Sequence, residues 1–168
     1  MKIDSILILA AGKGTRLRPY TDNLPKSLLP LGETNILRNL ILQSKKYFEE
    51  AKIYVNASYL AEKIIDEIVN LPLEIRPQII WEQIPLGPAF TVTNHCNENK
   101  GNVLVLHGDN FFTDLTYSEF AKSINQITQN KEKSDKMILG GLKVIEENKG
   151  STEKIFELIK PLIDRNLF

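Results

Sequence analysis

The sequence predicts an α/β fold in three layers, with a mainly parallel central sheet and helices on both faces. Two observations support this prediction. Short apolar runs of strand length alternate with segments of helical period over most of the 168 residues, an order typical of a parallel sheet covered by helices. The run "VLVLH" (Val103–His107) is almost wholly apolar, as expected for a strand that is covered on both faces.

Five segments are predicted to be strands because they are short, apolar and separated by helical or polar segments. The first contains the run "ILIL" and ends in a loop rich in glycine and cationic residues. In chain order, the predicted strands are residues 5–10, 52–56, 78–82, Val103–His107 and 136–144.

Four segments are predicted to be helices because their apolar residues recur three and four positions apart. In the first of them, Ile36, Leu37, Leu40 and Ile41 share one face. The predicted helices are residues 34–47, 60–69, 86–95 and 118–128. The charged runs at 131–136 and 146–153 are predicted to be solvated loops.

Composition limits the class of function. Lys plus Arg and Asp plus Glu both number 21, so the formal net charge is zero, which argues against a general nucleic-acid binder. The single cysteine, Cys96, makes no internal disulfide and no cysteine-rich zinc site.

No apolar run approaches the roughly 18 residues of a membrane span and the N-terminus has no signal-peptide pattern, so we expect a cytoplasmic protein. The length suits one domain over residues 1–168.

The loop after the first strand, "LAAGKGTRLRPYTDNLPKSLLPL", has the chemistry of a phosphate site. Gly12 and Gly14 let backbone N–H groups approach an anion closely. Lys13 and Arg16 add positive charge, and Arg16 can bind a phosphate through two parallel hydrogen bonds. Thr15 adds a hydroxyl donor. The glycine spacing fits neither a Walker A motif nor the dinucleotide-binding fingerprint.

Charged residues follow other predicted strands as well. Glu82 ends the third strand, and Asp109 follows the fourth. Ligands of parallel sheets bind beyond the carboxyl ends of the strands, so we expect these residues and the glycine loop to meet at one edge. Lys26, which follows Pro25, is expected to join them. The alternatives are a surface lysine at 26 and a turn aspartate at 109.

The two histidines have simpler interpretations. His107 ends the fourth strand, where it either approaches the site or has its hydrogen bonds satisfied at the strand end. His95 lies beside Cys96, but two potential ligands do not make a metal site.

These segments resemble the sugar-1-phosphate nucleotidylyltransferases, the NDP-sugar pyrophosphorylases. The signature of that family is a strand, then Gly-x-Gly-Thr-Arg-Leu-x-Pro, a nearby Thr, and Pro-Lys further on. "EQIPLGPAF" resembles the segment that frames the base, and "LVLHGDN" resembles the strand and Gly-Asp whose aspartate holds a metal ion. "YVNASYLAEKI" resembles the subgroup that handles mannose-, heptose- or N-acetylmuramate-type phosphates. All the signature elements are present: Gly12, Gly14, Thr15, Arg16, Leu17, Pro19, Thr21, Pro25 and Lys26.

The resemblance implies a Rossmann-like fold and a reaction in which a nucleoside triphosphate and a sugar 1-phosphate give an NDP-sugar and pyrophosphate. The sugar phosphate oxygen attacks the α-phosphorus in line. Arg16 would stabilise charge on the pyrophosphate, Lys26 would bridge the α-phosphate and the sugar phosphate, and Asp109 would bind Mg²⁺. The implied nucleotide-binding residues are Ala11, Gly12, Lys13, Gly14, Thr15, Glu82 and Gly87.

The implied partners are a nucleoside triphosphate and a sugar 1-phosphate or related phosphorylated acceptor, without nucleic acid or membrane. A homo-oligomer is an open option. A glycosyltransferase with a related sheet usually shows Asp-x-Asp, whereas "HGDN" offers one aspartate.

The sequence departs from the family pattern in two places. Pro88 and Phe90 stand where the family usually has Thr and Gly, and Phe90 either crowds the nucleotide or fills the core. Residues 1–145 match the family core, and 146–168 form a short segment in place of the usual sugar-binding half. In that segment, Lys160 and Pro161 are either a remnant of the family's Glu-Lys-Pro or part of an amphipathic helix. The only late aspartate there is Asp164.

The short C-terminal segment leaves three functions open. The first is a compact enzyme with a small phosphorylated acceptor, which gives every residue of the glycine loop a purpose. The second is a non-catalytic nucleotide-binding relative with a regulatory or scaffolding role. The third is a subunit whose site a partner completes.

Overall fold

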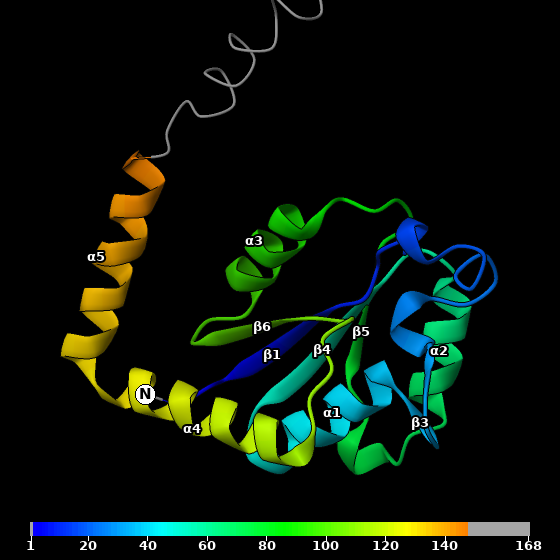
Figure 1. The fold of residues 1–168 in the computed structure, drawn as a ribbon, viewed down its shortest axis with the longest axis horizontal. Helices are drawn as coiled ribbons and strands as arrows, with labels where there is room; N and C mark the ends of the chain where they lie inside the picture. Colours follow the sequence, from blue (N-terminus) through cyan, green and yellow to red (C-terminus); the bar gives the residue numbers. More distant parts are fainter. Residues whose placement is uncertain (1, 148–168) are drawn as a thin grey trace, which may run out of the picture. The chain divides into compact units, whose positions relative to one another are not determined.

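The structure of the chain is a computed structural model that describes residues 2–147 (Figure 1). The chain divides into two compact units, residues 1–126 and 127–168, and each is considered by itself. The predicted C-terminal helix and the residues Lys160, Pro161 and Asp164 lie outside the described residues.

A four-stranded parallel sheet forms the centre of the first unit, in the order β5–β4–β1–β6. Leu9 at the end of β1 is in register with Asn56 of β4 on one side and with His107 of β6 on the other. The carboxyl ends of these three strands therefore lie level, and the segments that follow them meet at one edge. The strands are β1 (Ser5–Leu9), β4 (Lys52–Ala57), β5 (Gln78–Trp81) and β6 (Val103–His107).

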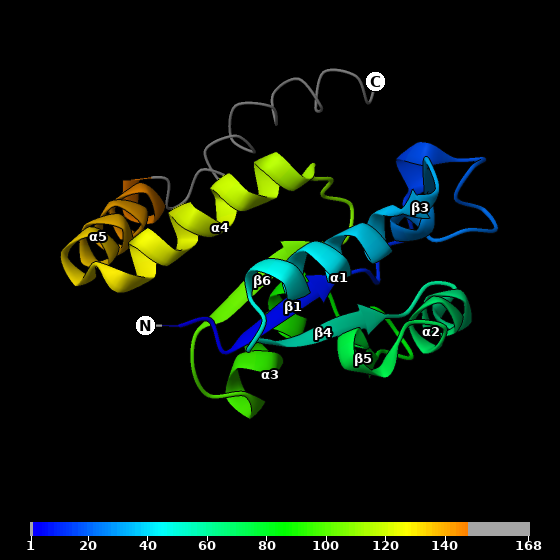
Figure 2. The same ribbon diagram turned by 90° about the horizontal axis from the view of Figure 1, so that it is seen from below.

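Helices cover both faces of the sheet, which confirms the predicted three-layer α/β fold. In Figure 1, α3 lies above the strands and α1 lies below them, and Figure 2 views the sheet from the α1 side. None of the described helices combines the length and the apolar character that crossing a membrane requires. The helices are α1 (Ile36–Tyr47), α2 (Ala61–Val69), α3 (Pro88–Glu98), α4 (Asp114–Gln129) and α5 (Lys131–Glu147).

Side-chain alternation along the strands explains how one sheet serves two layers. Ile6 and Ile8 of β1 are fully buried in the main core, together with apolar side chains of α1, α2 and α4. In β4, Tyr54 belongs to the opposite face, where its ring meets the ring of His95 in α3 at a centroid distance of 4.5 Å. Burial on both faces stabilises the strands that carry the candidate site.

Short elements fill the connection between β1 and α1 and the connection between α2 and β5. Asn35 caps α1 by accepting a hydrogen bond from the backbone N–H of Arg38 at 2.8 Å, so the helix begins two residues later than predicted. The short elements are the 3-10 turns η1 (Thr15–Leu17), η2 (Lys26–Leu28) and η3 (Leu73–Ile75) and the antiparallel pair β2 (Pro30–Leu31) and β3 (Thr34–Asn35).

The prediction for residues 131–144 was wrong. A loop at 131–136 and a strand at 136–144 were expected, but both segments belong to the helix α5. The side chain of Asn130 accepts a hydrogen bond from the backbone N–H of Lys133 at 2.9 Å, which starts the helix. Most residues that follow are good helix formers, and a short apolar run does not by itself distinguish a strand from a helix. Glu146 also lies in α5, although it was assigned to a solvated loop.

Candidate active site

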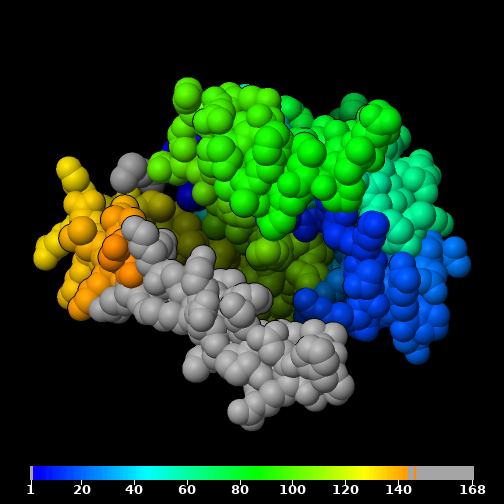
Figure 3. Space-filling model, turned by 90° about the horizontal axis from the view of Figure 1, so that it is seen from above, coloured from blue at the N-terminus to red at the C-terminus, as the bar shows by residue number. Residues whose placement is uncertain are grey.

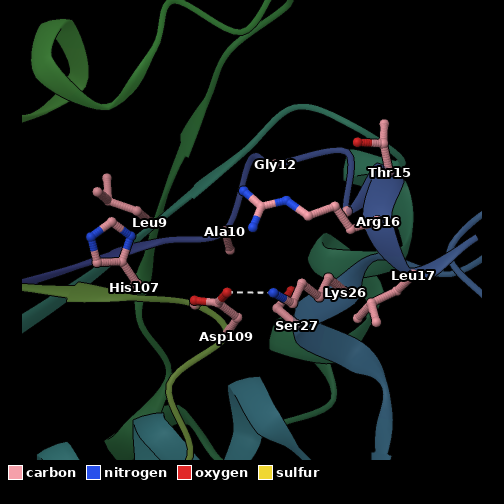
Figure 4. A pocket seen from close by; sticks show the side chains of 12 residues that line it. Leu9, Ala10, Gly12, Thr15, Arg16, Leu17, Lys26, Ser27, His107 and Asp109 are labelled. Carbon is pink, nitrogen blue, oxygen red and sulfur yellow. Dashed lines mark hydrogen bonds and ion pairs between the residues drawn. The ribbon is translucent and has the colours of Figure 1, made fainter.

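A cavity of about 510 Å³ opens at the carboxyl ends of β1 and β6 (Figure 4). Three segments that are distant in the sequence form its wall: the glycine loop after β1, the turn η2 and the turn after β6. The cavity thereby brings together Arg16, Lys26 and Asp109, as the sequence predicted. The lining residues are Leu9, Ala10, Gly12, Gly14, Thr15, Arg16, Leu17, Lys26, Ser27, His107, Gly108 and Asp109.

The glycine loop owes its shape to Gly14, which has a φ of 61° in the left-handed region. A Cβ added there would lie 3.0 Å from the Thr21 side chain and 3.1 Å from Cβ of Lys26, so the position has little room for a side chain. The buried Thr21 hydroxyl donates a hydrogen bond to the Gly14 carbonyl at 2.9 Å. Gly14 and Thr21 together hold the loop against the segment that carries Lys26.

Tyr59, which follows β4, ties the connection between η1 and η2 to the sheet. Its hydroxyl lies 2.9 Å from the carbonyl oxygens of both Thr21 and Asp22 and donates to them. The connection between η1 and η2 is therefore held at its middle. This contact stabilises the position of Lys26 relative to the strand ends.

Gly108 brings Asp109 close to the end of β1. Its backbone N–H donates to the Leu9 carbonyl at 2.8 Å, which extends the β1–β6 pairing by one residue. A Cβ on Gly108 would lie 2.7 Å from that carbonyl oxygen and 3.1 Å from Cα of Ala10. Only glycine allows this close approach, and it sets the side chain of Asp109 at the mouth of the cavity.

Lys26 and Asp109 form an ion pair across the cavity, with Nζ of Lys26 2.5 Å from Oδ2 of Asp109 (dashed line in Figure 4). The hydrogen bond from Lys26 is the main cause that lowers the pKa of the Asp109 carboxyl, and the positive charge of Lys26 adds to it. Asp109 is therefore ionised at neutral pH. Both side chains are more than one-third exposed, so a phosphate or a cation has access to either partner.

The two cations of the glycine loop differ in position. Arg16 lines the cavity from η1, and in Figure 4 its guanidinium group extends toward Gly12, above the Lys26–Asp109 pair. Lys13 is exposed and does not line this cavity. The structure thus places Arg16, but not Lys13, among the groups that face a ligand there.

A second cavity, of about 220 Å³, shares Leu9, Gly12 and His107 with the first. Its far wall comes from the segment between β5 and α3, and Figure 3 shows the green surface of that region beside the blue surface of the N-terminal loop. The predicted residues Ala11, Glu82 and Gly87 therefore meet here. The lining residues are Leu9, Ala11, Gly12, Asn56, Glu82, Pro85, Gly87, Pro88 and His107.

The carboxylate of Glu82 is buried and already hydrogen-bonded. Oε1 accepts from the Thr91 hydroxyl at 2.5 Å and from the Asn56 amide at 3.1 Å, and Oε2 accepts from the backbone N–H of Leu86 at 3.3 Å. Glu82 thus forms part of the wall. Asn56 was not singled out from the sequence, although a polar residue at the end of a buried strand could have signalled it.

The remaining candidates are placed as follows. His107 lines both cavities, whereas His95 is buried, and its two ring nitrogens lie 3.2 Å from the Ser5 hydroxyl and from the Asn99 amide. Cys96 is exposed. Phe90 is 54% exposed and lines neither of these cavities, so it neither fills the core nor crowds the second cavity.

The first cavity suits a divalent cation held by a single protein carboxylate. Among residues 2–147 no group of three or more His, Cys, Asp or Glu side chains could hold a metal ion, and Asp109 is the only carboxylate that lines this cavity. Mg²⁺ typically binds to one or two carboxylates, with phosphate oxygens and water completing its shell. The donor set therefore fits a cation that shares its ligands with a phosphorylated substrate.

Comparison with known proteins agrees with this geometry. The family model described as Nucleotidyl transferase matches residues 5–150. The chain belongs to the nucleotidyl transferase family. Members of this family generally use a divalent metal, which is consistent with the fit of the carboxylate of Asp109.

The relatives and solved structures that match this chain cover it only in part. It is 38% identical over 108 residues to the bifunctional protein GlmU of Methanococcus maripaludis, a match that spans 64% of this chain and 25% of GlmU. HddC from Yersinia pseudotuberculosis, solved in complex with GMP-PN, is 28% identical, with a TM-score of 0.55 over 72% of this chain and 54% of HddC. The chain spans about a quarter of the length of the curated relatives that it matches first.

A further solved structure shares the fold of this chain. CTP:phosphocholine cytidylyltransferase (LicC) from Streptococcus pneumoniae has a TM-score of 0.56 at 24% identity, over 68% of this chain and 49% of LicC. The Rossmann-like, mainly parallel sheet predicted from the sequence is therefore found in this chain and in solved neighbours.

Proposed function

We propose that this chain binds a nucleoside triphosphate and transfers its nucleotidyl group to a sugar 1-phosphate, or to a related phosphorylated acceptor, with release of pyrophosphate. One observation carries the proposal. Two cationic side chains, one carboxylate and a glycine loop surround a single cavity, and this cavity adjoins a second one beside Glu82 and Gly87. A triphosphate suits the first cavity and a base suits the second.

The first cavity supports in-line attack on the α-phosphate. Two anions must approach each other, and cationic groups fixed in advance lower the barrier to that approach. We assign Lys26 to the α-phosphate and the incoming acceptor phosphate because it lines the first cavity beside the glycine loop, where its ammonium group pairs with Asp109. We assign Arg16 to the leaving pyrophosphate, since its planar guanidinium group binds two phosphate oxygens at once.

The backbone of residues 11–15 would wrap the triphosphate and bind it through the N–H groups that follow Ala11, whose own N–H donates to Asn56. Gly12 has no neighbouring atom within 4 Å of an added Cβ, so the space above it is open to a ligand. Asp109 would hold Mg²⁺, and that ion, when bound, would neutralise phosphate charge. Lys26 must then exchange Asp109 for a phosphate, which an exposed ion pair allows at small cost.

The proposal is tested by measuring pyrophosphate release from a matrix of nucleoside triphosphates and phosphorylated sugars or alcohols, with Mg²⁺ present. One strong combination that Lys26→Ala abolishes would support the transferase. A blank matrix, with nucleotide binding still measured by calorimetry, would reject catalysis by this chain alone. It would favour a nucleotide-binding relative or a site that a partner completes.

A further inference from the structure

The side chain of Asn56 connects the two cavities. Asn56 is the penultimate residue of β4, is 3% exposed and lines the second cavity. Its Oδ1 accepts hydrogen bonds from the backbone N–H groups of Ala10 at 2.7 Å and Ala11 at 3.3 Å, where the glycine loop begins. Its Nδ2 donates to Oε1 of Glu82 at 3.1 Å. One buried amide thus contacts both the loop of the first cavity and the wall of the second.

The polarity of these neighbours fixes the orientation of the amide. Two backbone N–H groups require an acceptor on one side, and a carboxylate requires a donor on the other. Asparagine supplies both from one short side chain. A leucine would supply neither, and it would leave the two N–H groups and the carboxylate without these partners, at the cost of buried unsatisfied groups.

Glu82 extends this connection into the second cavity. Its oxygens accept hydrogen bonds from the Thr91 hydroxyl of α3 and from the backbone N–H of Leu86, which precedes Gly87. The chain of hydrogen bonds therefore runs from the glycine loop through Asn56 and Glu82 to the segment that forms the far wall. Displacement of Asn56 would shift that wall relative to the loop.

We propose that Asn56 is a positioning residue that holds the phosphate-binding loop and the wall of the second cavity at the spacing needed by one nucleoside triphosphate. This inference rests on the proposed function, since it requires that the nucleotide occupies both cavities. Inorganic triphosphate, which has no base, would need only the first cavity. The two ligands therefore report on different parts of the same connection.

Asn56→Asp isolates the link to Glu82. The new carboxylate still accepts from Ala10 and Ala11, so the loop keeps its bonds. It also places two buried carboxylates against each other. Like charges repel, and the uptake of a proton that would relieve the repulsion costs free energy at neutral pH. We expect the affinity for nucleoside triphosphate to fall by about tenfold or more, while the affinity for inorganic triphosphate changes by less than about threefold.

The double variant Asn56→Asp with Glu82→Gln restores the pairing. The amide introduced at position 82 would donate to the carboxylate introduced at position 56 and to the Thr91 hydroxyl, and its oxygen would accept from the N–H of Leu86. Thr91 can then donate to the Gly87 carbonyl, which already lies 3.1 Å from its hydroxyl. Glu82→Gln alone lacks this match, because Asn56 and Leu86 both donate to position 82. In either orientation, the amide NH₂ of the glutamine would face one of these two donors. We expect the double variant to recover most of the lost affinity.

The experiment is calorimetric titration of the wild-type chain and these three variants with the nucleoside triphosphate that the wild type binds best, and with inorganic triphosphate. Amide hydrogen exchange at Ala10 and Ala11 accompanies it. Exchange should stay slow in Asn56→Asp and become faster in Asn56→Ala, which lacks the acceptor.

The outcomes separate the positioning role from the proposed function. Selective loss of nucleotide affinity that the double variant rescues supports the positioning role. Equal loss for both ligands, no loss, or no rescue overturns it while leaving the proposed function intact. If the wild-type chain binds inorganic triphosphate but no nucleoside triphosphate, the proposed function and the inference that rests on it both fail.

Discussion

Nζ of Lys26 lies 2.5 Å from a carboxylate oxygen of Asp109, and the two residues come from segments 83 positions apart in the sequence. Each is held by a different device. Lys26 is in a short 3-10 turn next to Gly14, and Asp109 follows a glycine that packs directly on β1. The backbone therefore holds Lys26 and Asp109 close together at the mouth of the cavity before any ligand binds.

Under the proposed function, Lys26→Ala should lower turnover by on the order of 10²-fold or more, because it removes the cation that we assign to the reacting phosphates. The measurement is initial pyrophosphate release at saturating substrates. The matched control is Lys2→Ala, which also breaks an exposed lysine–carboxylate pair, that of Lys2 with Glu50 at 3.0 Å. Equal rates for Lys26→Ala and Lys2→Ala would contradict the assignment of Lys26.

Arg16→Lys should retain the charge but lose the bidentate phosphate contact that we propose for Arg16, and its rate should fall between those of wild type and Arg16→Ala. Arg18→Lys serves as the control, because Arg18 pairs with Asp22 at 3.1 Å and does not line the first cavity. Steady-state kinetics for each variant provide the test. If Arg16→Lys were as active as wild type, a bidentate contact would be excluded.

Gly14→Ala should destabilise the fold by roughly 1–3 kcal/mol, because a side chain at positive φ is strained and Thr21 and Lys26 leave it little space. Gly12→Ala is the matched variant in the same loop, with no positive φ and no atom within 4 Å of the added Cβ. Urea denaturation should show a shifted midpoint for the first variant only. A similar loss of stability in both variants would show that the left-handed backbone of Gly14 is not the cause.

Stability should fall in mild acid because of His95. Burial lowers the pKa of His95 below its usual 6.5. The unfolded chain therefore binds a proton at a higher pH than the folded chain does, so the free energy of unfolding decreases as the pH falls below about 6.5. It stops decreasing once the pH is below the folded pKa. Denaturation of wild type and His95→Gln at several pH values between about 7 and 5 tests this sign.

The His95→Gln variant should show a flatter pH dependence over that range. His107→Gln is the control, because it removes the other histidine of the chain, which is exposed. An unchanged slope in His95→Gln would mean that other groups cause the acid sensitivity.

The sequence was sufficient to predict the site where local pattern decides the structure. The apolar runs located β1, β4, β5 and β6, and the rule that ligands bind at the carboxyl ends of parallel strands located the first cavity. The network at Asn56 was not predicted, because it depends on the register of β4 against β1, in which Asn56 pairs with Leu9. Register is a property of two paired strands, and the sequence of one strand alone does not determine it.

The failure at residues 131–144 has a different physical origin. A strand requires a partner to satisfy its backbone, whereas a helix satisfies most of its backbone internally. The apolar run "MILGGLKV" favours a strand only when it is taken without the cap at Asn130 that starts a helix ahead of it. Lys13 illustrates a third limit, since charge in a loop does not reveal which way a side chain points.

The extra hydrogen bond from Gly108 to Leu9 has a consequence for how the protein responds to heat. The glycine loop extends from the end of β1 and Asp109 from the end of β6, and this bond joins the two ends. β6 is an edge strand of the sheet, so its separation from β1 would carry Asp109 away from the glycine loop. On heating, ligand-binding capacity should therefore be lost together with the pairing of β6, as amide hydrogen exchange along β6 would measure.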